Sequence, residues 1–228
     1  MLAIIKKEFK SYFCTPIGYV CIGVFLLAFS LSFYISPYQS GTINFESIFY
    51  TFPIVIALII IVALLTMRTF AEEKKNGTDQ LLMTAPISLT KIVLAKFIAA
   101  TLVIVITEIC TLMYFAILSF FGMPDIPTSL VALLGFLLLN MAYISFGILA
   151  SSLTENQIIA GLLTIGFFII NWMLPSLNEV FSNYALIDIF SKFVYGQIDI
   201  ADTATFVLFT ILCLLLTIVG LQRRKSIR

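Results

Sequence analysis

The sequence contains no histidine. Ser-His-Asp triads, Cys-His dyads and histidine-bound metal centres are therefore impossible within this chain. Its four cysteines form no CxxC pair, and two of them, Cys110 and Cys213, lie inside apolar runs. We interpret them as small core residues, so the sequence predicts neither catalytic residues nor a metal site.

Charge is also scarce. Charged residues make up 11% of the chain, against roughly 25% in a soluble domain, and a net charge of +1 excludes a strongly basic nucleic-acid surface. Hydrophobic residues reach 61%, with a mean hydropathy of +1.11. The apolar runs are continuous over 17 to 30 residues rather than alternating as in a barrel. The sequence therefore predicts an all-α integral membrane protein.

The apolar runs predict six membrane-spanning helices in a single transmembrane domain, 1–228. Each run has at least 17 residues, enough to cross a hydrocarbon core of about 30 Å. The predicted spans are 17–36, 48–67, 92–121, 130–153, 158–174 and 204–221. The third is longer than a bilayer requires, so we expect it to tilt or to project into water.

The first residues predict a helix over 2–13 that lies in the membrane interface. Leu2, Ile5, Phe9 and Tyr12 recur at helical spacing, and charged residues occupy the other side. A signal peptide is the competing interpretation, but its apolar core has about 7–15 residues and ends at a cleavage site. The run that follows Pro16 is longer, so we interpret it as a retained span.

The basic residues predict that both termini are cytoplasmic. With the N-terminus inside, 12 of the 13 Lys and Arg residues fall on the cytoplasmic side, and Lys192 is the exception. Six acidic residues fall on the opposite side. The reverse orientation would carry the 12 basic residues across the membrane.

The outer segment 175–203 is predicted to be re-entrant rather than an ordinary loop. An apolar stripe recurs there at helical spacing, formed by Tyr184, Ile187, Phe190 and Val194. A solvated loop would not need this stripe. It predicts one or two short helices that dip into or lie on the outer leaflet.

The connection 68–91 is the sizeable cytoplasmic loop of this topology. We expect the second span to continue as a helix through 68–75. Gly77 suits a left-handed residue that ends it. Thr78 can then cap a new helix over 78–85.

The predicted helix over 78–85 is short and amphipathic. Asp79 is favourable in its first turn and Pro86 ends it. Leu81 and Leu82 fall on one face. A solvated loop would not need leucines there, so this face predicts a cytoplasmic protein partner.

Two stretches of the sequence resemble the membrane subunits of ABC transporters of the ABC-2 permease family. They are Lys6-Lys7-Glu8-Phe9-Lys10-Ser11-Tyr12-Phe13 with Pro16-Ile17-Gly18-Tyr19, and Glu72-Glu73-Lys74-Lys75-Asn76-Gly77-Thr78-Asp79-Gln80-Leu81-Leu82-Met83-Thr84-Ala85-Pro86-Ile87. The chain is most similar to the branch of gliding-motility and nitrous-oxide-reductase maturation permeases, over essentially its whole length. Gln80 stands where the family pattern usually carries a glutamate.

The resemblance implies a permease subunit of a prokaryotic plasma membrane that works with a separate ABC ATPase. Helix 78–85 would be the coupling helix seated in a groove of that ATPase. The residues expected to couple to it are Glu72, Glu73, Lys74, Gly77, Thr78, Asp79, Gln80, Leu81, Leu82 and Pro86. Two ATPases would join two permeases, which are either two copies of this chain or this chain and a related subunit. The resemblance leaves open whether an accessory extracytoplasmic protein joins the complex.

ATP binding and hydrolysis are expected to take place on the separate ATPase subunit. The sequence carries no Walker motif, and its GxxxxG spacings lie inside spans without a following Lys-Ser/Thr. ATP and Mg²⁺ would therefore bind to the ATPase subunit. This chain is expected to bind no cofactor and to have no enzymatic activity of its own.

Two polar residues are predicted near the middle of the membrane. Glu108 lies 16 residues after Ile92, and a charge at that depth costs several kcal/mol unless it is paired or hydrated. Asn140 is also near mid-span and is a candidate partner for it. The alternatives are a substrate path or dimer interface on one hand, and hydrogen bonding between helices on the other.

The predicted function is that of an exporter subunit moving a hydrophobic, lipid-like or peptide substrate. A secondary transporter or channel is one alternative, although such proteins show inverted repeats, broken helices or several intramembrane charges. A membrane scaffold that recruits an ATPase without transport is the other.

Overall fold

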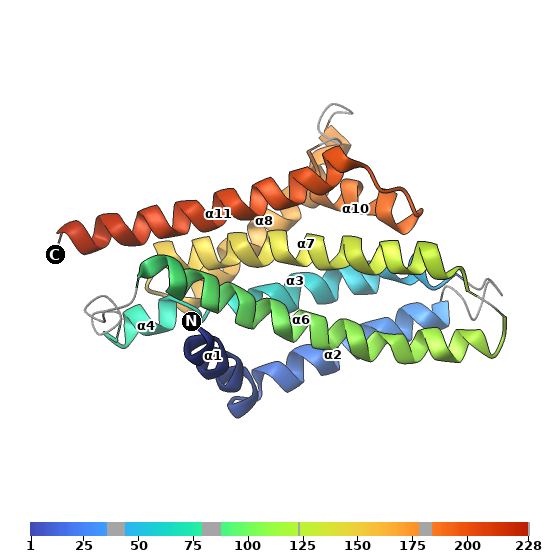
Figure 1. Cartoon of the computed structure of the whole chain (residues 1–228), viewed down its shortest axis with the longest axis horizontal. Helices are drawn as coiled ribbons and strands as arrows, with labels where there is room; N and C mark the ends of the chain where they lie inside the picture. The colour runs from blue at the N-terminus through green and yellow to red at the C-terminus, as the bar shows by residue number, and fades with distance from the viewer. Residues whose placement is uncertain (36–43, 79–87, 123, 178–183, 228) are drawn as a thin grey trace.

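The computed structural model describes residues 1–35, 44–78, 88–122, 124–177 and 184–227. Every regular element in these ranges is helical, which confirms the predicted all-α class for this part of the chain. In order, the elements are α1 (Leu2–Cys14), α2 (Ile17–Phe33), the 3₁₀ helix η2 (Glu46–Tyr50), α3 (Phe52–Thr66), α4 (Ala71–Lys75), α6 (Leu89–Ser119), α7 (Ile126–Leu153), α8 (Gln157–Leu177), α10 (Leu186–Val194) and α11 (Ile200–Ile227). The long helices form an elongated bundle (Figure 1).

Within the described residues, five helical segments are long and apolar enough to cross a membrane. They are Phe52–Lys75, Leu89–Ser119, Ile126–Leu153, Gln157–Pro175 and Ile200–Arg223. α2, with 17 residues, qualifies only together with α1, and these two helices meet at a bend of 68°. The structure therefore supports five or six spans, and the count of six stays a prediction.

The second predicted span, 48–67, is divided at both ends. Its first residues belong to η2, and α3 begins only at Phe52, directly before Pro53. Proline suits the first turn of a helix because its missing N–H would be unpaired there anyway. α3 then ends at Thr66, and a turn over 67–70 separates it from α4. The helical segment therefore runs on to Lys75 as predicted, but 67–70 form a turn within it rather than regular α-helix.

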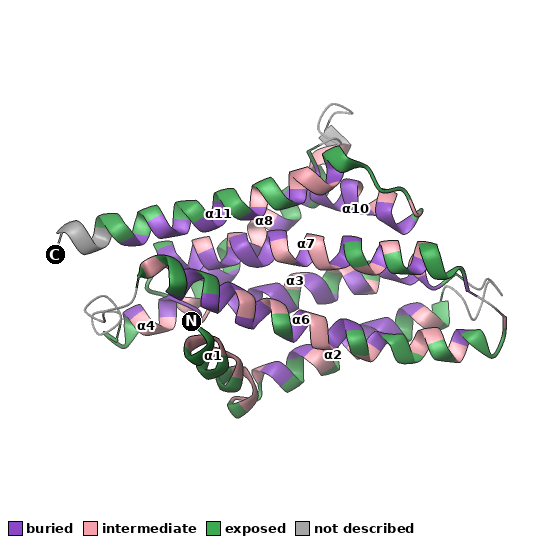
Figure 2. Cartoon of the chain, in the orientation of Figure 1, coloured by how far each residue is buried: buried purple, intermediate pink, exposed green. Residues whose placement is uncertain are grey.

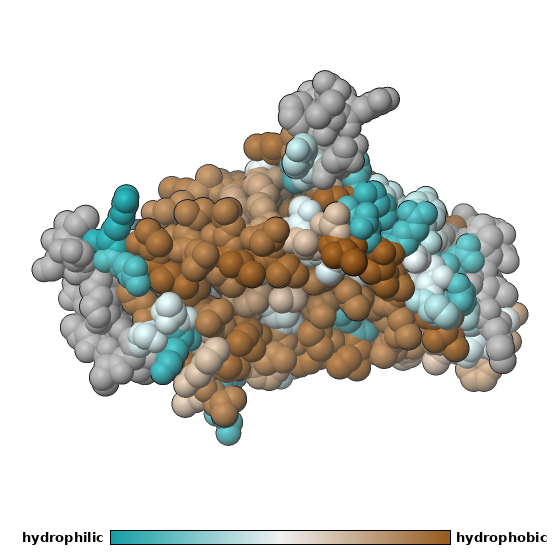
Figure 3. Space-filling model, turned by 45° about the horizontal axis from the view of Figure 1, so that its top comes forward, coloured by the Kyte–Doolittle hydropathy of each residue, from teal (hydrophilic) through white to brown (hydrophobic). Residues whose placement is uncertain are grey.

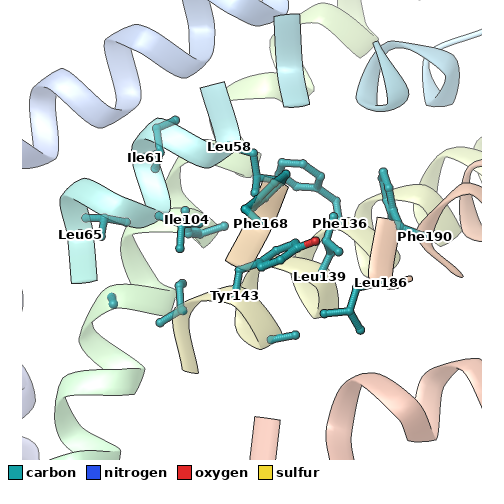
Figure 4. Packing of buried hydrophobic residues seen from close by; sticks show 14 of the residues in the cluster. Leu58, Ile61, Leu65, Ile104, Phe136, Leu139, Tyr143, Phe168, Leu186 and Phe190 are labelled. Atoms are coloured by element: carbon teal, nitrogen blue, oxygen red, sulfur yellow. The ribbon is translucent and has the colours of Figure 1, made fainter. Parts of the chain in front are cut away.

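α7 lies at the centre of the bundle. α11 runs along it, and α3, α6, α8 and α10 also pack against it. Tyr143 of α7 stacks on Phe168 of α8 with ring centroids 4.2 Å apart, amid Leu58, Phe136 and other buried side chains (Figure 4). A second aromatic cluster, which includes Phe29, joins α2 to η2, α6 and α7.

The outside of the bundle is apolar over a broad central belt, and hydrophilic groups gather toward its two ends (Figure 3). α11 buries the side that faces α7 and exposes the other (Figure 2). Leu208, Leu212 and Leu215 are each more than half exposed on that outer side. Such a surface is stable against lipid tails and unstable against water.

The predicted re-entrant segment contains α10, a nine-residue helix. Its apolar stripe packs on protein, because the Phe190 ring lies 5.9 Å from Phe136 of α7 and 6.4 Å from Tyr50 of η2. Tyr184 does not belong to the buried stripe, since it is 69% exposed. α8 runs on through Pro175 to Leu177, and 178–183 lie outside the described residues.

One close helix contact depends on a glycine. A Cβ built on Gly147 of α7 would lie 2.7 Å from Cβ of Thr66, a fully buried residue at the end of α3. By contrast, a Cβ on Gly166 of α8 meets nothing within 4 Å. Glycine at 147 therefore lets α3 and α7 approach at the point where α3 ends.

We predict that Gly147→Ala destabilises the bundle by about 1–3 kcal/mol, because Thr66 has no room to move. Gly166→Ala is the matched control and should leave stability equal or higher, since alanine favours helix. Thermal unfolding of the two purified variants in detergent would measure the difference. Equal midpoints for both variants would contradict the proposed close contact.

Candidate coupling site

The turn between α3 and α4 is fixed by a serine of α7. The Ser151 hydroxyl accepts hydrogen bonds from the backbone N–H groups of Phe70 and Ala71, both at 3.0 Å, and donates to the carbonyl of Met67 at 3.3 Å. The first N–H groups of a helix lack partners within it. Ser151 supplies that partner to α4, so α7 holds the turn and the start of α4 in place.

The other end of α4 is closed by the predicted left-handed glycine. Gly77 has φ +70°, its N–H donates to the carbonyl of Lys74 at 3.1 Å, and the N–H of Thr78 donates to that of Glu73 at 2.9 Å. This pair of hydrogen bonds is the Schellman arrangement. The Lys74 ammonium donates to the carbonyl of Ser152, so α4 is tied to the end of α7 a second time.

A buried lysine of α6 joins the same place. The Lys96 side chain is 2% exposed, and its ammonium donates to the carbonyl of Thr69 and to Oε1 of Glu73, both at 2.7 Å. It also pairs with Oε2 of Glu8 on α1 at 3.4 Å and lies 5.0 Å from the Phe70 ring centroid. An ammonium has three N–H donors, and here three oxygen atoms from three segments surround it.

A second contact joins α1 to this part of the bundle. The Tyr12 hydroxyl donates to the carbonyl of Leu65, in the last turn of α3, at 3.0 Å. Arg68, just beyond that turn, makes two hydrogen bonds to the Glu72 carboxylate, at 2.7 and 2.8 Å. We call this set of residues the α4 junction: Glu8, Tyr12, 67–78, Lys96, Ser151 and Ser152.

The α4 junction makes α4 a connecting piece between helices that are distant in sequence. α1 and α6 meet it through Glu8 and Lys96, and α7 meets it through the two serines. The N-terminus and the C-terminal end of α11 lie toward the same end of the bundle as α4 (Figure 1). A displacement of α4 would therefore act on α3, α6, α7 and α1 together.

The predicted coupling residues divide into two groups. Glu72, Glu73, Lys74, Gly77 and Thr78 lie in the α4 junction, and the first three form the contacts given above. The remaining predicted residues lie outside the described residues: Asp79, Gln80, Leu81, Leu82 and Pro86. The predicted helix 78–85 therefore stays a prediction, although Thr78 stands at the expected place directly after the left-handed glycine.

The two predicted mid-membrane residues are buried, but no hydrogen bond between them is seen among the described residues. Asn140 donates to the carbonyl of Phe136 in its own helix at 2.8 Å. Glu108 is 9% exposed, and its Oε1 atom has no hydrogen-bond partner in the described part of the chain. Their roles in a substrate path or dimer interface stay predictions.

Sequence reasoning assigned no role at this site to Glu8, Tyr12, Lys96, Ser151 or Ser152, and none elsewhere to Asn171. The charge distribution places Lys96 on the cytoplasmic side, and the apolar pattern places Ser151 and Tyr12 in helices. Neither pattern indicates that these residues meet. Asn171 of α8 accepts hydrogen bonds from the Tyr143 hydroxyl at 2.9 Å and from the N–H of Leu186 at 3.0 Å, joining α7, α8 and α10. One signal was available: Lys96 follows Ile92 and Val93 and so falls on an apolar helix face.

The arrangement defines a helical membrane subunit with a polar junction at one end. Residues 2–183 match a family model described as ABC-2 family transporter protein. This match covers most of the chain, and the protein therefore belongs to the ABC-2 transporter family. A comparison with curated proteins gave no match. The chain is a multi-pass membrane protein, and its family provides permease subunits that work with an ABC ATPase.

We predict that Lys96→Gln destabilises the protein by about 3–5 kcal/mol, because two largely buried carboxylates would lose their cation. The double variant with Glu73→Gln should lose less unfolding free energy than the two single variants lose together. Lys91→Gln, an exposed lysine in the same helix, is the control. Thermal unfolding of the four variants would measure the interaction energy between Lys96 and Glu73. A Lys96 variant as stable as the Lys91 control would refute the prediction.

Proposed function

We propose that this chain is the permease subunit of an ABC exporter. It would couple ATP hydrolysis by a separate ATPase to the movement of a hydrophobic, lipid-like or peptide substrate. Membership of the ABC-2 family supports the permease role. The observation that carries the coupling role is the α4 junction, where Lys96 holds Glu73, Glu8 and the Thr69 carbonyl in one place.

The coupling would work through the segment between α4 and α6. It leaves α4 at the left-handed Gly77 and rejoins the bundle at Leu89, where α6 begins. An ATPase that gripped 78–85 would pull on both ends of this segment. One end is tied to α7 through Ser151 and Ser152, and the other continues directly into a 31-residue helix. Movement of the ATPase would thus reach α3, α6 and α7 together.

In this proposal the end that carries the α4 junction faces the cytoplasm. The predicted cytoplasmic basic residues include Lys7, Arg68, Lys74 and Lys96, which the structure brings to this end. The 68° bend between α1 and α2 suits an α1 that lies along the membrane surface while α2 enters it. The nearby ATPase would bind ATP and Mg²⁺.

A second permease would complete the transporter. α8 and α11 carry large exposed apolar surfaces, including Ile158, Leu162 and Ile170 on α8. In the working complex these surfaces would face lipid tails or the second permease. Glu108 and Asn140 lie inside the bundle, and in this proposal they contribute to the substrate path or to the contact between permeases.

We predict that replacing Leu81 and Leu82 by aspartate weakens ATPase binding at least about tenfold, because anchor residues dominate such interfaces. Membrane insertion should be unchanged. Leu153→Asp is a control at the last residue of α7, where the leucine is 68% exposed. Co-purification with the ATPase and transport in vesicles are the measurements. A double variant that still binds the ATPase and transports normally would show that 78–85 is not the coupling segment.

We also predict that Thr78→Cys is shielded from a membrane-impermeant maleimide in intact cells and reacts after permeabilisation. Asp125→Cys, between α6 and α7 at the other end of the bundle, should react in intact cells. The exposed native Cys14 is first replaced by serine. Labelling of Thr78→Cys in intact cells would place the α4 junction outside and overturn the proposed coupling.

A further inference from the structure

The α4 junction borders a cavity of about 350 Å³. Its walls come from α1, from the start of α2, from the connection around α4, and from Lys96 of α6. This volume lies at the lower end of the range of small-ligand sites, about 300–1,000 Å³. It is large enough for a small polar group and too small for a folded partner.

The walls of the cavity carry equal numbers of opposite charges. Lys7, Arg68 and Lys96 supply three cations, and Glu8, Glu72 and Glu73 supply three carboxylates. A ligand with one charge would satisfy the groups of opposite sign and leave the others facing a like charge. A zwitterion that carries one anionic and one cationic group avoids that conflict.

The groups on the walls are not equally available. Lys96 and Glu73 are largely buried and hold each other at 2.7 Å. The side chain of Lys7 is 72% exposed, and those of Arg68 and Glu72 are 31% and 34% exposed. The Lys7–Glu8 contact is long, at 3.8 Å. Arg68 and Glu72 hold each other through two hydrogen bonds, but a guanidinium has five N–H donors and a carboxylate can accept several bonds. Lys7 can therefore turn toward a ligand, and Arg68 and Glu72 can contact it through their remaining positions, while the Lys96–Glu73 pair stays intact.

An apolar stripe leads away from the cavity along α2. Ile17 lines the cavity, and Val20, Leu27 and Leu31 follow on the helix at 47%, 62% and 50% exposure. Residues at this spacing share one helix face. A molecule whose polar end occupied the cavity could lay an acyl chain against this stripe. A soluble zwitterion would make no use of it.

We propose that this cavity binds the headgroup of a phospholipid that carries a phosphate and a primary ammonium. The phosphate would lie toward Arg68 and Lys7, and the ammonium toward the carboxylates of Glu8 and Glu72. A primary ammonium can donate hydrogen bonds to carboxylates, whereas a trimethylammonium group cannot. The bound lipid would link α1 to the α3–α4 connection, next to the Lys96 contacts.

The test uses the purified full-length permease without ATPase or ATP, so a negative result leaves the proposed coupling untouched. Phosphatidylethanolamine, phosphatidylcholine and phosphatidylglycerol with identical acyl chains are titrated in detergent, and bound lipid is counted by native mass spectrometry. Phosphatidylethanolamine should bind at least about tenfold more tightly than the other two. Equal binding of the three lipids would overturn the proposal.

Lys7→Gln is the test variant, because this lysine is exposed and its loss should not unfold the protein. It should weaken phosphatidylethanolamine binding about tenfold. Lys10→Gln removes the same charge from the same helix but lies outside the cavity, and it should bind like the unchanged protein. Equal binding by the two variants would overturn the site. Displacement of the lipid by an equal concentration of free phosphoethanolamine would overturn the lipid assignment in favour of a soluble ligand.

Discussion

A buried ammonium group requires compensating oxygen atoms, and the ammonium of Lys96 obtains them from three segments at once. Glu73 lies on α4, Glu8 lies on α1, and the Thr69 carbonyl lies in the turn between α3 and α4. Removing Lys96 would leave two carboxylates without compensation in a poorly solvated place. This requirement holds α1, α4 and α6 together more strictly than apolar contacts would, because apolar surfaces can slide past one another.

The rest of the bundle is packed against the α4 junction through α7. α7 contributes Ser151 and Ser152 at that end and Tyr143 and Phe136 in the core. At Gly147 it approaches Thr66 closely, so α3 cannot shift there without moving α7. Close-packed interiors respond to a displacement as connected pieces rather than as a fluid. A signal that entered through α4 would therefore spread through the central helix to α10 and α11.

Much of the fold was predictable because the membrane imposes simple rules. Continuous apolar runs predicted α6, α7 and α8 within a few residues of their observed ends, since each must satisfy its own backbone hydrogen bonds. They also located α11, which extends beyond the predicted 204–221 at both ends. The left-handed Gly77 was predictable as well, because few other residues adopt that conformation. The turn over 67–70 was not, because the hydroxyl that holds it belongs to Ser151, 81 residues away from Phe70.

The sequence by itself determined the class of protein, since 61% hydrophobic composition and scarce charge leave a lipid-facing helical bundle as the stable form. It also located the connection for which we propose the coupling role. Only the tertiary structure decided how that connection is anchored. Lys96, Glu8 and Ser151 are unremarkable in the sequence and become a single site only when α1, α6 and α7 converge. Charge compensation depends on distances in space, and sequence order does not encode those distances directly.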